Sequence, residues 1–319
     1  MGERIVFFGR NAGYGLTLSC FRELVKATRQ GPHAVAATVV SDDHHGEDGT
    51  LEDLAAGAGL PILRPSGNDV DAPEFVSQVR GLSPTLGVVV QFPRIFSPEL
   101  VAALGRDVLN LHRGWPLRGG SIDERAIVQG LDRYGLILHR IAGRIDGGNI
   151  LARRDFPLAS DETGYSIAAK ADRVATDLFV DSFLPLLGGP IPEGEVQDLA
   201  RTSYGAKGCL SDRIDLDRAA GDIERLIRAF HHPRKQGAGL ALRWRGQDAL
   251  LRVQPPATIG DAGGSPPGTV LDIDGDAATF ATGQGSLTLV KAIPVAPGRL
   301  LRSWRVVPGD RIDGSESFQ

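Results

Sequence analysis

Short apolar runs alternate with amphipathic stretches along the first half of the chain. The apolar runs end at glycine or polar residues, as buried strands do, and the stretches between them repeat apolar residues at helical spacing. We predict strands at residues 4–8, 34–40, 60–63, 87–91 and 107–112, and helices at 16–29, 50–59, 73–82 and 98–104. Strands that alternate with helices predict an α/β fold with a mostly parallel sheet covered on both faces.

The pattern changes in the second half. Residues 136–141 and 149–157 are two more strand-like runs, and residues 163–187 are mostly one long helix. The segment 188–197, GGPIPEGEVQ, is rich in Gly, Pro and acid, which is typical of an interdomain linker. A helix at 217–230 precedes short strands with turn signals, which predict a small β-barrel. We therefore expect a Rossmann-like domain over residues 1–189, a linker over 190–204, and a helix with an OB-like β-barrel over 205–319.

Two polar side chains, Asn110 and His112, stand at the end of the strand at residues 107–112. Residues i and i+2 of a strand point to the same face, so both side chains face one side while Leu111 points into the core. Imidazole transfers protons near neutral pH, and a carboxamide can donate a hydrogen bond to a developing oxyanion. Because ligands of such sheets bind at the carboxyl ends of strands, the pair predicts a catalytic site. The alternative is a core histidine beside an amide that caps the strand.

A carboxylate follows 34 residues later, in the segment RIDGGNIL. Asp146 comes after an apolar strand and before Gly147 and Gly148, where the backbone can approach a ligand closely. A carboxylate at a neighbouring strand end would orient the imidazole of His112 and raise its basicity. The alternative is a simple turn, since Asp-Gly is a common hairpin signal.

Taken together, these segments resemble the folate-dependent formyltransferase family, which includes glycinamide ribonucleotide, methionyl-tRNA and amino-sugar formyltransferases. The resemblance rests on NLH, LRGG, IDGGNIL, AIVQG, LILHRI and FPRIFSPEL in the first part, and on IDLDRAAGDIERLIRAF, GTVLDI, ATGQGSLTL and VVPGDRI in the second. It extends over nearly the whole chain. It implies the barrel domain that the longer members of the family append.

The resemblance also implies a chemistry: an amine takes the formyl group of 10-formyltetrahydrofolate, with no covalent intermediate and no metal. Asn110 and a protonated His112 would stabilise the tetrahedral oxyanion, and Asp146 would position His112 and help move a proton to the departing folate nitrogen. The folate-binding residues that it implies are Phe92, Pro93, Arg94, Ile95, Phe96, Gly143 and Ile145. Residues expected on the acceptor side are Tyr14, Arg113, Trp115 and Arg118. The neighbouring His44 and His45 lack a convincing ligand set for a metal.

The stretch after His112 departs from the family pattern. Relatives have a Pro-Ser-Leu-Leu-Pro type loop there and an Arg-Gly pair eight residues beyond the histidine, whereas Arg118 stands only six beyond His112. The expected loop is therefore short, and it carries Arg113 and Trp115. Either it has drifted, with Trp115 packing against the barrel domain, or it forms an altered donor or acceptor pocket in which Arg113 or Arg118 meets an anionic group.

Charge bears on the acceptor. The chain has a net charge of −4, and the residues from Pro190 onward carry 16 basic and 16 acidic side chains, so they offer no basic platform. Where methionyl-tRNA formyltransferases carry a basic loop, this chain has SDDHHGEDGTLED, without Lys or Arg. Arg243, Arg245 and Arg252, with Trp244, form either a local basic patch or a solvated strand face. We therefore expect a small amine, such as an amino sugar or a specialised metabolite, and no nucleic acid.

Three other functions stay open: methionyl-tRNA formylation, hydrolysis of 10-formyltetrahydrofolate, and folate binding without catalysis in a site that Trp115 closes. Hydrolases of the family carry an extra N-terminal domain, and this chain begins at the first strand, which argues against hydrolysis. No run of about 18 apolar residues predicts a membrane span, and the start does not fit a signal peptide. Cys20 and Cys209 fit reduced thiols, so we expect a cytoplasmic location. The oligomeric state stays open.

Overall fold

The structure is a computed structural model that groups the chain into two compact units. It describes residues 2–11, 15–41, 49–232, 237–244, 247–275, 277–290, 293–294, 308–309 and 311–312. The first unit comprises Met1–Gly119, Arg133–Pro157 and Ala169–Gly205, and the second comprises Gly120–Asp132, Leu158–Ala168 and Ala206–Gln319. Residues 190–204 thus group with the first unit, and their role as a domain boundary stays a prediction.

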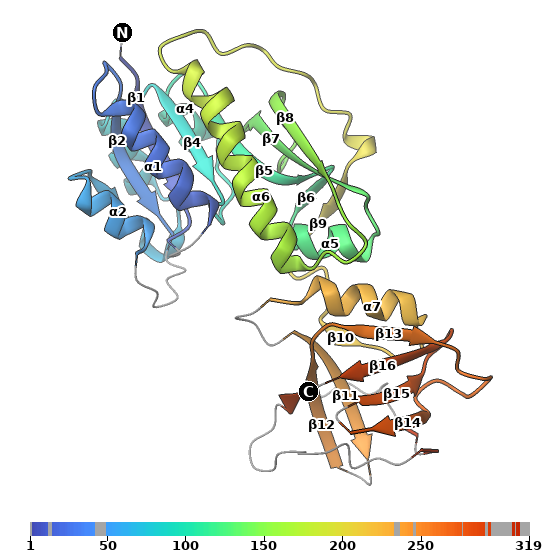
Figure 1. Cartoon of the computed structure of the whole chain (residues 1–319). Helices are drawn as coiled ribbons and strands as arrows, with labels where there is room; N and C mark the ends of the chain where they lie inside the picture. The colour runs from blue at the N-terminus through green and yellow to red at the C-terminus, as the bar shows by residue number, and fades with distance from the viewer. Residues whose placement is uncertain are drawn as a thin grey trace. The chain divides into compact units, whose positions relative to one another are not determined.

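A seven-stranded sheet forms the centre of the first unit (Figure 1), in the order β3-β2-β1-β4-β5-β7-β8. The strands are β1 (Arg4–Gly9), β2 (Ala34–Val40), β3 (Ile62–Leu63), β4 (Leu86–Val90), β5 (Val108–Trp115), β7 (Arg133–Arg140) and β8 (Ile150–Pro157). The first five pair in parallel, while β7 and β8 join the edge antiparallel. The predicted α/β fold with a mostly parallel sheet is confirmed.

Helices cover both faces of this sheet. Side chains of β1 alternate between the faces, so neighbouring residues of this strand contact different helices. On one face the ring of Phe7 lies 5.0 Å from that of Phe21 on α1 (Leu16–Thr28). On the other face Val6 and Phe8 share an apolar cluster with buried residues of the two helices α3 (Pro73–Gly81) and α4 (Pro98–Ala103). In Figure 1, α1 and α6 (Gly164–Leu178) lie in front of the sheet.

The helix starts follow from local sequence. Thr50 and Asp53 form the capping box at the start of α2 (Leu51–Gly57), as their spacing predicted. Ser97 accepts a hydrogen bond from the backbone N–H of Leu100 at the start of α4, and Pro98 occupies the first helical position. The long helix predicted at residues 163–187 is α6 followed by two short turns, η2 (Phe179–Phe183) and η3 (Leu184–Leu186).

Strand β5 is longer than predicted. It continues past His112 to Trp115, and both Arg113 and Trp115 pair with β7, with a register shift between them. The prediction of a loop at these residues is therefore wrong: the antiparallel neighbour supplies partners for their backbone groups. The short strand β6 (Leu117–Gly119) follows β5 and pairs in parallel with β9 (Ser203–Gly205).

The second unit contains two four-stranded sheets, in the orders β10-β11-β12-β17 and β13-β16-β15-β14. Its helices and strands are α5 (Ile122–Val128), α7 (Ala220–Ala229), β10 (Arg213–Ile214), β11 (Ala238–Trp244), β12 (Gln247–Val253), β13 (Ala257–Gly260), β14 (Val270–Asp274), β15 (Ala277–Ala281), β16 (Ser286–Val290) and β17 (Ile293–Pro294). Apolar residues of α7, such as Ile223 and Ile227, pack in one cluster with Phe280 and Leu287 of the second sheet. Closure of these sheets into an OB-like barrel stays a prediction.

The described residues bear on the membrane span and on the two cysteines. No helix among them combines the length and the apolar character that a membrane crossing needs. Cys20 is buried and Cys209 is exposed, and both are free. The cytoplasmic location stays a prediction.

Candidate active site

Strand β5 places Asn110 and His112 side by side on one face of the sheet. Leu109 and Leu111, which alternate with them, are fully buried in the core. The His112 side chain is only 7% exposed, and Asn110 is half-buried. Both residues therefore sit at a partly covered position where polar groups need hydrogen-bond partners.

Asp146 meets both side chains from the connection between β7 and β8. Its Oδ1 lies 3.3 Å from Nδ2 of Asn110 and 3.5 Å from Nδ1 of His112. Its Oδ2 accepts a 3.0 Å hydrogen bond from the backbone N–H of Gly119. Asp146 has a φ of 50°, a left-handed conformation that is uncommon for a residue with a side chain. The three polar residues singled out in the sequence thus converge in one group.

The hydrogen bonds of His112 fix the position of its ring. Nε2 lies 2.9 Å from the backbone oxygen of Leu117, which can only accept, so Nε2 carries a hydrogen. Nδ1 faces the carboxylate of Asp146. A His112 that is protonated on both nitrogens would donate to Leu117 through one and toward Asp146 through the other. This arrangement suits an imidazolium that acts as an acid or as a charge stabiliser.

A second histidine, His139, completes the group, and the sequence interpretation did not include it. It lies on β7 directly opposite Asn110 and is almost fully buried. Its Nδ1 lies 2.8 Å from the backbone oxygen of Arg140, so Nε2 is left to accept the 3.0 Å hydrogen bond from Nδ2 of Asn110. Burial first, and then the neighbouring His112, lower the pKa of His139 from 6.5 to about 4. His139 is therefore a neutral acceptor that orients the amide of Asn110.

The segment expected to bind folate follows β4. The side chains of Phe92 and Phe96 pack into the core against Phe8, with ring centroids 5.5 and 4.7 Å from it. The side chain of Ile95, between them, is 68% exposed. Pro93 is half-buried and Arg94 is exposed. The two phenylalanines anchor the segment, and Ile95 offers an apolar contact to solvent or ligand.

The remaining predicted residues lie around the same loop. Gly143 is exposed, and Ile145 is half-buried immediately before Asp146. Arg118 donates 2.8 Å hydrogen bonds to the backbone oxygen of Ile145 and to Oγ1 of Thr202. Arg118 is thus engaged in bracing the loop that carries Asp146.

Arg113 and Trp115 also have partners within the first unit. Arg113 forms a 3.0 Å ion pair with Asp172 of α6. The guanidinium of Arg153, on β8, lies 3.4 Å from the centre of the Trp115 ring. Tyr14, the other residue expected on the acceptor side, lies outside the described residues, as do His44 and His45.

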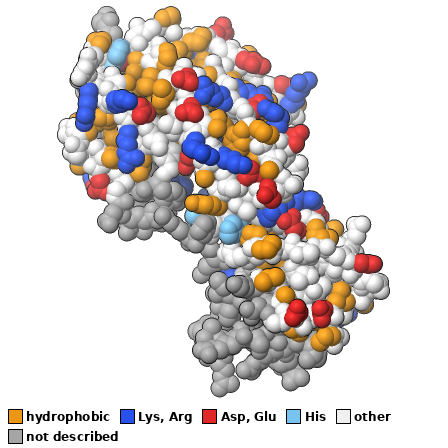
Figure 2. Space-filling model, in the orientation of Figure 1, with side chains coloured by type: hydrophobic (Ala, Val, Ile, Leu, Met, Phe, Trp, Pro, Cys, Tyr) orange, Lys and Arg blue, Asp and Glu red, His pale blue; other side chains and the backbone are white. Residues whose placement is uncertain are grey.

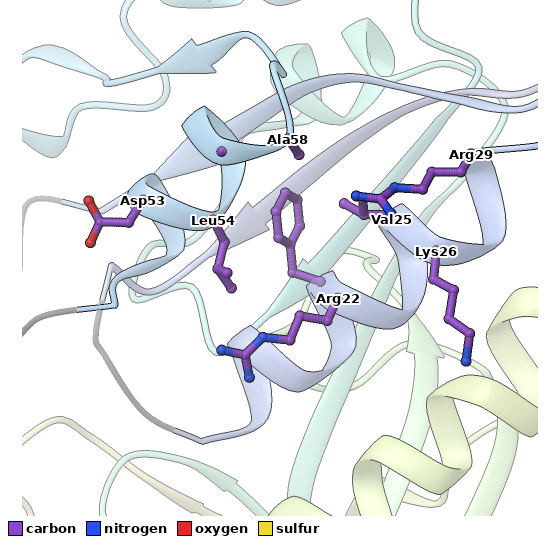
Figure 3. Close-up of a pocket in the computed structure, with 9 residues that line it drawn as sticks. Arg22, Val25, Lys26, Arg29, Asp53, Leu54 and Ala58 are labelled. Carbon is purple, nitrogen blue, oxygen red and sulfur yellow. The ribbon is translucent and has the colours of Figure 1, made fainter.

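Two surface cavities lie elsewhere in the first unit. One of about 470 Å³ lies between α1 and α2 (Figure 3), where Arg22 and Arg29 flank an apolar floor that includes Val25 and Leu54. Another of about 300 Å³ lies beyond the ends of β1 and β2. It is lined by Asn11, Val40, Ser41, Thr50, Glu52, Asp53 and Arg64. Neither is lined by Asn110, His112 or Asp146.

Within the part of the chain that the structure describes, no three His, Cys, Asp or Glu side chains are arranged to hold a metal ion. The polar group on β5, β7 and the loop at Asp146 consists of two imidazoles, one amide and one carboxylate. Such a set moves protons and stabilises charge on an oxygen.

A protein-family model described as formyl transferase matches residues 4–182, more than half of the chain. The chain belongs to the formyl transferase family. The match spans the whole of the seven-stranded sheet, and it includes Asn110, His112, His139 and Asp146. This formyltransferase is thus an enzyme of one-carbon transfer, as the resemblance to the folate-dependent formyltransferases implied.

Similar sequences are methionyl-tRNA formyltransferases. That of Acidithiobacillus ferrooxidans is 28% identical over 317 residues, with 93% of each chain covered. That of Roseiflexus sp. is 29% identical over 327 residues, with 99% of this chain and 95% of the relative covered. The similarity therefore extends through both units.

Similar solved structures are sugar N-formyltransferases. A sugar 3N-formyl transferase named WlaRD superimposes with a TM-score of 0.66 at 14% identity, covering 92% of this chain and 98% of the other. The N-formyltransferase from Helicobacter canadensis gives a TM-score of 0.65 at 14% identity, covering 91% and 99%. At this level of identity the likeness shows a shared fold alone.

Proposed function

We propose that this formyltransferase moves the formyl group of 10-formyltetrahydrofolate to the amine of a small molecule, such as an amino sugar or a specialised metabolite. The observation that carries the proposal is that the carboxylate of Asp146 lies 3.3 Å from the amide of Asn110 and 3.5 Å from the ring of His112. Family membership supplies the reaction, and these three side chains supply the groups that it needs.

In the proposed reaction the acceptor amine attacks the formyl carbon directly. A carbon–nitrogen bond forms, and the formyl oxygen takes the negative charge of a tetrahedral intermediate. His112, protonated on both ring nitrogens, stabilises this charge through its own positive charge, because its two N–H bonds are directed at Asp146 and at the backbone oxygen of Leu117, which hold the ring. Collapse of the intermediate breaks the bond to the folate nitrogen, which receives the proton that the amine has lost.

Asn110 is the second group proposed to stabilise the oxyanion. Its two N–H bonds point to His139 and Asp146, at 3.0 and 3.3 Å. Donation to the formyl oxygen therefore requires the longer of these two bonds, the one to Asp146, to open when the substrates bind. The bond to neutral His139 keeps the amide nitrogen on the side of the reacting group.

The donor pocket is proposed at residues 92–96 and at the loop that contains Gly143 and Ile145. The exposed side chain of Ile95, held by the buried Phe92 and Phe96, supports an apolar contact to the folate ring. Two structures with the same fold also support a folate donor. WlaRD was solved in the presence of 5-N-formyl-THF, and the Helicobacter canadensis enzyme was solved with folinic acid.

The proposed acceptor is a small amine. The Helicobacter canadensis enzyme was solved with dTDP-3-aminofucose, which supports an amino sugar. Methionyl-tRNA is the second candidate, because relatives of that name match across nearly the whole chain. The acidic stretch SDDHHGEDGTLED favours the small amine. Basic and acidic side chains are also interspersed on the face of the first unit that Figure 2 shows, without a single basic field.

The proposal is tested by following the release of tetrahydrofolate from 10-formyltetrahydrofolate with a panel of acceptors. The panel contains nucleotide-linked amino sugars, free amino sugars, methionyl-tRNA and no amine. We expect release that depends on one small amine. Release with methionyl-tRNA alone would assign the enzyme to tRNA, and release without any amine would make it a hydrolase. Folate binding without release under all conditions would support a binding protein.

A further inference from the structure

The short strand β6 contacts two of the three proposed catalytic side chains, His112 and Asp146. Its Leu117 backbone oxygen accepts the hydrogen bond of His112, and its Gly119 backbone N–H donates to Asp146. Within the described chain, the ladder partner of β6 is β9, in a two-stranded parallel sheet. A Cβ atom at Gly119 would collide with the backbone oxygen of Gly205, so glycine permits this close pairing.

Strand β9 is the last part of a segment that contacts the loop carrying Asp146. We call residues 195–205 the strap. At its start, Glu195 and Ile150 exchange two backbone hydrogen bonds of 2.7 and 2.8 Å at the beginning of β8. Further along, Thr202 accepts the hydrogen bond of Arg118, whose guanidinium also reaches the backbone oxygen of Ile145. The strap is therefore attached on both sides of the loop that carries Asp146.

Gln197 makes the central contact of the strap. Its side chain is 91% buried, with a relative exposure of 9%. Its Nε2 donates to the backbone oxygens of Asp146 and Gly148, at 3.1 and 2.6 Å. The first of these bonds holds the backbone of Asp146, the residue with the left-handed φ of 50°. The Oε1 of Gln197 has no hydrogen-bond partner among the described residues. A buried orphan acceptor is unfavourable for stability, which argues for a role other than stability alone.

We propose that the strap is part of the catalytic site and that Gln197 is a positioning residue for Asp146. The strap acts through two routes. Gln197 holds the backbone of Asp146, and β9 holds β6, which in turn fixes the Asp146 carboxylate and the His112 ring. A segment that the sequence predicted to be a linker thereby sets the geometry of His112 and Asp146. This inference rests on the proposed function for its catalytic part.

The test uses the full chain with Gln197→Met, which keeps the length of the side chain and removes its hydrogen-bond donors. We expect kcat for formyl transfer to fall by about 10- to 100-fold, because small displacements of a reacting group cost rates of this size. The KM values for donor and acceptor should stay within about twofold. The pH profile of kcat should also change, because the variant would displace the Asp146 carboxylate that faces Nδ1 of His112.

Asn149→Ala is the matched control. The Asn149 amide donates to the backbone oxygen of Glu193 at 3.2 Å, so it also ties this loop to the chain before the strap, without contacting Asp146. We expect wild-type kcat and pH profile for this variant. Thr202→Val serves as the second test variant if Gln197→Met fails to fold, because it removes the strap's contact with Arg118. An unchanged kcat and pH profile in a folded strap variant would overturn the proposal.

Hydrogen–deuterium exchange of residues 144–149 separates this inference from the proposed function. Exchange should rise more in Gln197→Met than in Asn149→Ala, whatever the enzyme's acceptor. If wild type shows no formyl transfer but the loop responds in this way, the proposed function fails and the role of the strap in holding Asp146 stands. Equal exchange in Gln197→Met and wild type would overturn the positioning role itself.

Discussion

At the scale of single residues, the site depends on which groups are charged. Asn110 is held by a histidine that is neutral at neutral pH and by a carboxylate. His112, which also faces the carboxylate, is the imidazole available to carry charge. The two histidines therefore have different roles, although their rings lie only 6.1 Å apart. Burial and the neighbouring His112 lower the pKa of His139, which keeps this ring neutral.

The lowered pKa of His139 predicts a pH dependence of stability. An unfolded imidazole binds a proton below about pH 6.5, whereas native His139 binds one only below about pH 4. Between these values the unfolded state holds more protons, so acidification favours unfolding. His139 should therefore remove about 3 kcal/mol from the free energy of unfolding as the pH falls from 7.5 to 4.

Urea unfolding of wild type and His139→Asn at both pH values measures this difference. The variant is expected to be less stable at pH 7.5, and its free energy of unfolding should fall less on acidification than that of wild type. Equal losses in the two proteins would show that His139 is protonated in the native state at neutral pH or exposed to water.

The strand period of two was sufficient to place Asn110 and His112 on one face, whereas Asp146 was joined to them only through the resemblance to the formyltransferase family. His139 could not be found in this way. Its role depends on the antiparallel register that sets it opposite Asn110, and register between strands is a tertiary property. Gln197 was missed for a related reason, since its partners lie about 50 residues earlier in the chain.

At the scale of elements, the antiparallel edge formed by β5, β7 and β8 shapes the stretch after His112. Gly135 on β7 pairs with Trp115, and Asp155 on β8 pairs with Gly135. The three strands are closely packed there because Gly135 has no side chain. This packing, together with Arg153 over the indole, explains why a tryptophan can occupy the end of β5.

Gly135→Ala should destabilise the protein. A Cβ atom there would lie 2.7 Å from the backbone oxygen of Trp115 and 2.8 Å from Oδ1 of Asp155, so strands or side chains must shift. Such overpacking costs about 1–3 kcal/mol. Gly57→Ala is the control, because a Cβ at that helical glycine meets nothing within 4 Å. It should be neutral or stabilise by up to about 1 kcal/mol. Thermal unfolding compares the two, and equal midpoints would contradict the packing account.

The elements themselves were largely predictable. The strands and helices of the first unit follow hydrophobic periodicity, and Thr50 and Asp53 mark the start of α2 by their side-chain chemistry. The end of β5 was not predictable, since Gly114 and Pro116 are turn signals that the pairing with β7 overrides. The local preference for a turn is overridden where a neighbouring strand supplies hydrogen-bond partners for the backbone.

At the scale of the whole molecule, net charge separates the two candidate acceptors. A chain with a net charge of −4 has little attraction for a polyphosphate backbone. We expect binding to methionyl-tRNA no tighter than the non-specific range of about 10⁻⁴–10⁻⁶ M at physiological salt. Fluorescence titration over a series of salt concentrations measures it. Tight binding that weakens steeply as salt rises would contradict the assignment to a small amine.

The most direct test of the account is the rate of formyl transfer by His112→Ala. With the acceptor found in the panel, we expect transfer to be abolished while the thermal midpoint changes by only a few degrees. His33→Ala is the control. It removes another imidazole of the first unit, one that accepts a hydrogen bond from the backbone N–H of Glu3, and it should keep the wild-type rate. If His112→Ala retained most of its activity, the assignment of proton transfer and charge stabilisation to this group would be wrong.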